Sequence, residues 1–280
     1  MKTIRNHVPK LMTVVLLLLG MAAVTTAQAQ AAPQRVTAGA TVCSNSPIPP
    51  GWVVTSSYRS SGCPGTGVSY TIADATGQTY LNVCSFSPIP AGWVVTSSYS
   101  SSSCAGTGVA YSIGNVTNQT YANVCSMSPI PAGWVITSSY SSSSCAGTGV
   151  AYTIGNVANQ TYANVCSMSP IPAGWVITSS YSSSSCVGTG VAYTIGNVAN
   201  QTYANVCSMS PIPAGWVITS SYSSSSCAGT GVAYTISKIT NQTYANVCSF
   251  SPIPAGWVIA STYSSSSCVG SGVAYSIRKV

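Results

Sequence analysis

The chain has 280 residues, and only 3% of them are charged, whereas soluble domains carry about 25%. The formal net charge is +7, but beyond residue 30 five basic side chains and one acidic side chain leave a net charge of +4. Nucleic-acid binding needs a clustered basic surface. Five scattered cations do not form one, so we predict no nucleic-acid partner.

The N-terminal segment 1–29 has the pattern of a secretory signal. Basic residues within 1–10 precede an apolar stretch over 11–24, and Ala27-Gln28-Ala29 supplies the small residues that a signal peptidase prefers. We therefore predict a signal peptide over 1–29 and a short linker over 30–35. No later stretch is long and apolar enough to span a bilayer. The mature chain is expected outside the cytoplasm, secreted or at the cell surface, without a membrane span.

The rest of the chain is an internal repeat with a period of about 41 residues, within the range of known repeat architectures. Tryptophan recurs at this period from Trp52 to Trp257, and the cysteines recur at two alternating intervals, beginning with Cys43, Cys63 and Cys84. The predicted repeats cover residues 36–76, 77–117, 118–158, 159–199, 200–240 and 241–280. Residues 124–164 and 165–205 differ at one position only, so these copies have hardly specialised. Equal copies suit multivalent contact better than a single asymmetric catalytic centre.

Each repeat contains three short runs rich in β-branched and aromatic residues. In the third repeat they cover 119–124, 133–140 and 149–154, and Gly, Pro, Asn or Ser bounds each run. This pattern predicts three β-strands and no helix. Strict alternation would place Trp134, Ile136 and Tyr140 on one face of the second strand.

A repeat of this length buries too little apolar surface to fold securely without disulfides or neighbouring repeats. Pairing the cysteines within each repeat closes a loop of roughly 20 residues, which stabilises by about 3 kcal/mol in chain-entropy estimates. The alternative register, starting with Cys63–Cys84, would leave Cys43 and Cys268 unpaired unless the array closed into a ring or met a second chain. We predict the pairs within repeats: Cys43–Cys63, Cys84–Cys104, Cys125–Cys145, Cys166–Cys186, Cys207–Cys227 and Cys248–Cys268.

The predicted fold class is therefore all-β, a tandem array of six three-stranded, disulfide-pinned units. A six-bladed propeller is the main alternative, although propeller blades usually hold four strands. Two trefoils or a β-solenoid are further alternatives.

The aromatic residues have two interpretations. Trp134, with Val135, Ile136, Val150 and Ile154, is expected to form the small core of its own repeat. Other rings, flanked by hydroxyl and amide side chains, could instead stack on sugars. The candidate ligand platforms are the tyrosines within the first predicted strand of repeats two to six: Tyr80, Tyr121, Tyr162, Tyr203 and Tyr244.

The acidic and histidine side chains that most catalysis requires are almost missing beyond residue 30. Without histidine or glutamate, and with the single aspartate Asp74, acid–base pairs, Ser-His-Asp triads and two-carboxylate hydrolysis lack their components. Cysteines so widely spaced in an exported chain favour disulfides over zinc ligation. We predict no enzymatic activity, no cofactor and no metal.

The sequence predicts a secreted, non-enzymatic repeat protein that serves as a structural or adhesive element at the cell exterior by displaying equivalent β units. A multivalent, lectin-like carbohydrate-binding protein is the first alternative, and a self-assembling extracellular fibre subunit is the second. The expected partners are accordingly cell-surface or matrix glycans, or other copies of the same chain.

Overall fold

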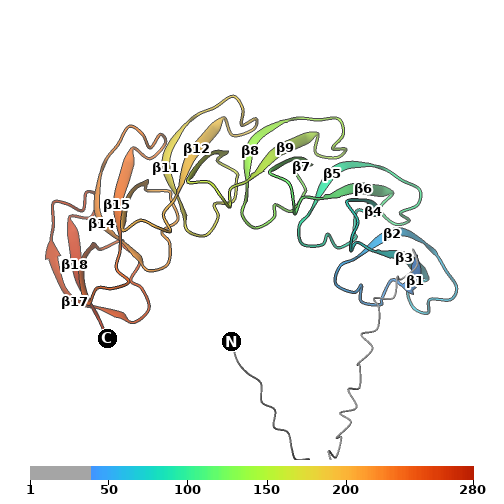
Figure 1. Ribbon diagram of the computed structural model, residues 1–280, viewed down its shortest axis with the longest axis horizontal. Helices are drawn as coiled ribbons and strands as arrows, with labels where there is room; N and C mark the ends of the chain where they lie inside the picture. The colour runs from blue at the N-terminus through green and yellow to red at the C-terminus, as the bar shows by residue number, and fades with distance from the viewer. Residues whose placement is uncertain (1–38) are drawn as a thin grey trace, which may run out of the picture. The chain divides into compact units, whose positions relative to one another are not determined.

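The computed structural model describes residues 39–280, and these contain eighteen β-strands. The predicted signal peptide, the linker and positions 36–38 of repeat one lie outside the described residues. Six sheets follow one another in chain order (Figure 1). The tandem array of three-stranded units is thus confirmed.

Each repeat contributes three strands to one antiparallel sheet. The first strands are β1 (Ala40–Cys43), β4 (Tyr80–Cys84), β7 (Tyr121–Cys125), β10 (Tyr162–Cys166), β13 (Tyr203–Cys207) and β16 (Tyr244–Cys248). The second are β2 (Trp52–Arg59), β5 (Trp93–Ser100), β8 (Trp134–Ser141), β11 (Trp175–Ser182), β14 (Trp216–Ser223) and β17 (Trp257–Ser264). The third are β3 (Val68–Asp74), β6 (Val109–Asn115), β9 (Val150–Asn156), β12 (Val191–Asn197), β15 (Val232–Lys238) and β18 (Val273–Lys279).

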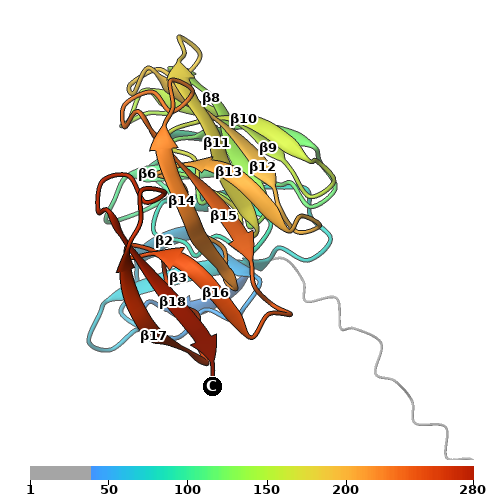
Figure 2. The same cartoon turned by 90° about the vertical axis from the view of Figure 1, so that its left-hand side faces the viewer.

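The third strand of every repeat lies in the centre of its sheet. The strand order in the third repeat is β7-β9-β8, and all six sheets share this order. In Figure 2, β18 lies between β16 and β17. The first and second strands are therefore edge strands, whose outer backbone groups need partners elsewhere.

A β-bulge interrupts the second strand of each sheet. In the third repeat Ile136 is opposite Ile154, whereas the next paired residue, Ser138, is opposite Thr153, so Thr137 is the extra residue. Tyr140 is opposite Ala151. Ala151 and Ile154 are an odd number of residues apart on the same strand, so their side chains lie on opposite faces of the sheet. The prediction that Tyr140 shares a face with Trp134 and Ile136 is wrong, because the bulge reverses the alternation.

The apolar core runs across neighbouring repeats. Trp134, Ile136 and Ile154 pack with Val94 and Val116 of the preceding repeat, and also with the disulfide cysteines of the following repeat. Trp134 is 4% exposed, as expected of a core residue. However, the core around Trp134 includes residues of the preceding and following repeats as well as its own.

Two residues predicted for that core lie elsewhere. Val135 belongs to the next cluster, with Trp175 and Ile177, and Val150 is only partly buried. Each sheet thus completes the core of its neighbours, and the prediction that each repeat forms a core of its own is wrong.

No closed ring forms within residues 39–280. Contacts between sheets join consecutive repeats, such as β5 with β7 and β8 with β10, and none joins the first sheet to the last. The propeller alternative is therefore not supported. The second strand of the last sheet, β17, is exposed along most of its length, and Ile259 is 49% exposed, whereas the equivalent Ile177 is 3% exposed.

Candidate binding surface

The six disulfides join the cysteines within each repeat, with Cα–Cα distances of 5.4 to 5.5 Å. The described residues contain no free cysteine. The predicted connectivity is confirmed. From the second repeat onward each disulfide also packs against the preceding sheet: Cys125 and Cys145 lie in one cluster with Trp93, Val95 and Ile113. The bond is therefore both a crosslink within one unit and an apolar contact with another.

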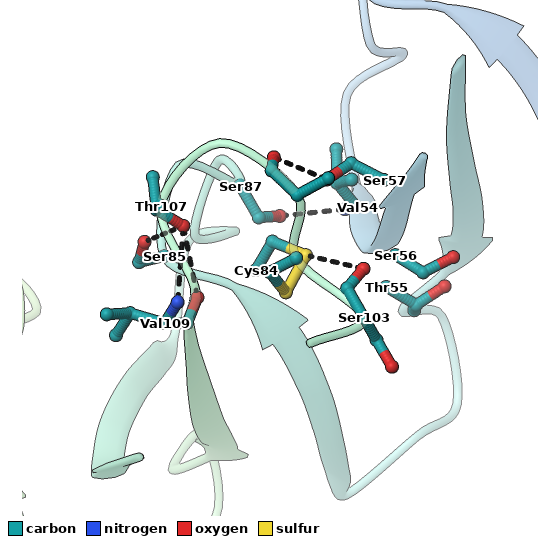
Figure 3. The surroundings of a disulfide bond; sticks show 12 residues. Val54, Thr55, Ser56, Ser57, Cys84, Ser85, Ser87, Ser103, Thr107 and Val109 are labelled. Atoms are coloured by element: carbon teal, nitrogen blue, oxygen red, sulfur yellow. Dashed lines mark hydrogen bonds between the residues drawn. A yellow bond between two sulfur atoms is a disulfide. The ribbon is translucent and has the colours of Figure 1, made fainter. Parts of the chain in front are cut away.

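From the second repeat onward, a serine of each repeat accepts a hydrogen bond from the edge strand of the preceding sheet. The backbone N–H of Val54 donates to the Ser87 hydroxyl at 2.8 Å, and that hydroxyl donates in turn to the carbonyl of Pro88. Figure 3 shows this contact beside the disulfide of Cys84. The N–H of Ser57 also donates to the carbonyl of Ser103, at 2.8 Å. The edge strand of one repeat is thereby hydrogen-bonded by the next.

This role of the serine was not predicted. The Ser-Pro-Ile-Pro segment has the pattern of a turn, because its prolines fix the backbone and glycine follows. Its serine is nevertheless retained in all six repeats, at 46, 87, 128, 169, 210 and 251. This recurrence in every repeat was the sequence signal that could have indicated a structural role for the serine.

Three similar hollows lie where the bulge of one sheet meets the first strand of the next. One is lined by Thr96 from the bulge and by Asn118, Gln119, Tyr121 and Asn123 of the following repeat. The hollows at Tyr121, Tyr162 and Tyr203 have volumes of about 500, 470 and 460 Å³. Their lining contains amides, hydroxyls and an aromatic ring, and no charged side chain.

The loop that shapes each hollow is fixed by an asparagine at the end of the third strand. The Asn115 side chain accepts a hydrogen bond from the backbone N–H of Thr117 at 2.9 Å, and the Asn115 backbone carbonyl accepts one from the Gln119 side-chain amide at 3.1 Å. Equivalent bonds hold Gln160 and Gln201. The glutamine and threonine of the hollow were not predicted as site residues, because their neighbourhood depends on the contact between two sheets.

All five candidate tyrosines are exposed, but to different extents. The exposed fractions are 53% for Tyr80, 69% for Tyr121, 68% for Tyr162, 66% for Tyr203 and 55% for Tyr244. They occupy equivalent positions at the start of the first strand of their sheets. The structure thus places an accessible ring in each of repeats two to six, and three of these rings lie in the hollows.

Comparisons of the chain with models of protein families, with curated proteins and with solved structures find no match.

The chemistry of the three hollows is that of a neutral polar surface. Residues 39–280 contain no group of three or more histidine, cysteine, aspartate or glutamate side chains that could hold a metal ion. No helix within this part of the chain is long and apolar enough to cross a membrane. Uncharged amides and hydroxyls beside an aromatic ring can hydrogen-bond and stack, which suits a neutral, hydroxyl-rich ligand.

The single carboxylate side chain caps a turn. The N–H of Thr76 donates to the Asp74 carboxylate at 2.9 Å and, with the Thr76 hydroxyl, holds the pKa of Asp74 below its ordinary value of 3.8. Asn115, Asn156 and Asn197 make the same backbone contact in later repeats. Asp74 therefore occupies a structural position that other repeats fill with a neutral amide.

Proposed function

We propose that this chain is an extracytoplasmic, non-enzymatic repeat protein that serves as a structural or adhesive element by displaying equivalent surfaces at a fixed repeat. Six disulfides are typical of an oxidising compartment outside the cytoplasm. Near-identical repeats favour many equal contacts over one specialised site.

The observation that best supports a structural role is the contact between consecutive sheets. The hydrogen bond from an edge-strand N–H to the serine of the next repeat recurs five times, at 2.8 to 2.9 Å. Each such contact also buries apolar residues of two or three repeats in one cluster. Continuous packing of this kind suits a load-bearing element better than a string of loosely linked beads.

Deletion of whole repeats tests the proposal. Removing residues 118–199, two complete repeats, would preserve the contact between the remaining sheets because the repeats are nearly identical. We expect a folded protein that is still exported and that attaches to its surface or matrix more weakly than the full chain, because it offers fewer equal contacts. Undiminished attachment after this deletion, or attachment lost through a single surface substitution in one repeat, contradicts the proposal.

The three hollows favour multivalent carbohydrate binding as a second candidate function. An exposed tyrosine ring can stack on the apolar face of a sugar, while Asn and Gln amides and a Thr hydroxyl bind its hydroxyl groups. Single contacts of this size are weak, but three at a fixed repeat add through multivalency. A glycan-array screen of the purified protein tests this function: saturable binding to neutral glycans is expected, and its absence removes the candidate.

A further inference from the structure

The five exposed tyrosines fall into two groups by their hydrogen bonds. The Tyr80 hydroxyl is hydrogen-bonded to Asn82 at 2.9 Å and to Ser112 at 2.7 Å, and the Tyr244 hydroxyl donates to Asn246 at 2.7 Å. Within residues 39–280, the hydroxyls of Tyr121, Tyr162 and Tyr203 make no such bond. We name the first two the closed tyrosines and the last three the open tyrosines. The open rings are also the more exposed, at 66% to 69% against 53% and 55%.

One position on the central strand separates the two groups. It holds serine beside the closed tyrosines and threonine beside the open ones: Ser112 and Ser276 against Thr153, Thr194 and Thr235. Tyr244 lies in the last repeat, which has a neighbouring sheet on one side only. Tyr80 is also closed, although its repeat has a sheet on both sides, so the missing neighbour does not explain the closed state.

Two causes could keep the open tyrosines from their hydrogen bond: competition with threonine for the asparagine oxygen, or the methyl group of threonine. The methyl group accounts for the difference better. Each of the three threonines donates to the neighbouring asparagine oxygen at 3.0 to 3.1 Å. Ser112 makes the same bond to Asn82 at 3.0 Å while Tyr80 is also hydrogen-bonded to Asn82. Since both hydroxyls lie within hydrogen-bonding distance of that oxygen, its contact with the serine does not by itself exclude the tyrosine. Threonine adds a methyl on a stiff, β-branched side chain, and this extra bulk stands beside the tyrosine where serine has none.

We infer that this serine or threonine position determines which repeats bind ligand, and that Tyr121, Tyr162 and Tyr203 form an array of three sites for neutral pyranose sugars. The inference rests on the second candidate function, carbohydrate binding. Each of the three open tyrosines lines one of the three hollows of about 460 to 500 Å³, a size within the usual range of small-ligand sites. Tyr203 also lines a larger hollow, of about 660 Å³, which includes Lys238. An open ring offers its face and a free hydroxyl to a sugar, whereas a closed ring has its hydroxyl bound to its own sheet. This reduces the five candidate platforms to three.

Two variants of the full chain test the inference. Thr153→Ser, Thr194→Ser and Thr235→Ser together should close the three open tyrosines, and Ser112→Thr with Ser276→Thr should open the two closed ones. Both variants should fold, because each residue already occupies the same position in another repeat. Thr148→Ser, in an exposed loop where repeat six has Ser271, is the matched control.

The accessibility of the tyrosine rings is measured first, without any sugar. Nitration by tetranitromethane, followed by intact mass, counts the tyrosines that react fast. Relative to the unaltered chain, we expect three fewer in the triple variant, two more in the double variant and no change in Thr148→Ser. Equal counts in all four proteins overturn the inference.

Binding is then measured by calorimetric titration with cellopentaose, xylopentaose and the N-acetylglucosamine pentamer as probes. We expect at least a tenfold loss of affinity for the bound probe in the triple variant, and a rise from three to five sites in the double variant. If the triple variant binds as tightly as the unaltered chain, the inference is wrong and carbohydrate binding stands. If no probe binds any protein, carbohydrate binding itself fails and the inference about the array fails with it.

Discussion

The hydroxyl of Ser128 accepts a hydrogen bond at 2.9 Å from the backbone N–H of Val95, which lies in the neighbouring sheet of the preceding repeat. Ser128 is buried, and Val95 is 1% exposed. The contact satisfies an edge strand that would otherwise hold an unpaired N–H inside the apolar interface between two repeats.

Ser128→Ala should therefore destabilise the protein by about 1 to 3 kcal/mol, the usual effect of leaving a buried donor unpaired. Urea unfolding followed by tryptophan fluorescence measures the change. Ser46→Ala is the matched control: Ser46 occupies the equivalent position in the first repeat, and no N–H within residues 39–280 donates to its hydroxyl. Similar losses in the two variants would show that the contact between repeats is not the cause.

Removal of an interior disulfide should destabilise more than removal of the first one. Cys125→Ala with Cys145→Ala loses about 3 kcal/mol of loop-closure stabilisation, and also the packing of both sulfurs against Trp93 and Val95. Cys43→Ala with Cys63→Ala loses the crosslink, but Cys43 is only partly buried. Thermal unfolding of the two variants should rank them in this order, and the reverse order would contradict a role of the disulfides in packing between repeats.

Ile177→Ala should destabilise by about 2 to 5 kcal/mol, as expected for a truncated core side chain. Ile177 is 3% exposed and packs against the disulfide cysteines of the next repeat, Cys207 and Cys227. Ile259→Ala changes the equivalent residue of β17, which is 49% exposed, so we expect less than half of that loss. Guanidinium unfolding of the pair measures the contribution of the following repeat, and equal losses would mean that it contributes little.

Stability should fall at low pH through Asp74. The folded-state pKa of this carboxyl is lowered by the hydrogen bonds from Thr76. A lowered pKa means that the carboxylate contributes stability above its unfolded value, and that the contribution is lost as the pH falls through the folded value. Asp74 is the only acidic side chain of the chain, so stability should change little between pH 5 and pH 8.

Asp74→Asn should remove this acid sensitivity, because asparagine makes the equivalent turn contact in other repeats. Thermal midpoints measured between pH 2.5 and pH 7 test this. An unchanged acid response in Asp74→Asn would assign it to another group, such as the terminal carboxyl.

Local patterns predicted the strands of each repeat with small errors. The expected segments 119–124, 133–140 and 149–154 correspond to β7, β8 and β9, with small shifts at the ends. Runs of β-branched and aromatic residues between turn residues suffice for such a prediction, since strand formation depends strongly on these side chains. The bulge at Thr137 was missed because an extra residue on one strand depends on its pairing partner.

The repeat period, the all-β class, the three strands and the cysteine spacing that favours bonds within repeats were determined by the sequence alone, because each depends on residues close together in the chain. The tertiary structure decided how repeats complete one another's cores, where Ser128 finds its donor and which tyrosines are open. These features depend on contacts between residues far apart in the chain, at the junctions of strands and sheets. Local propensity does not specify such contacts, because they form only when the sheets pack together.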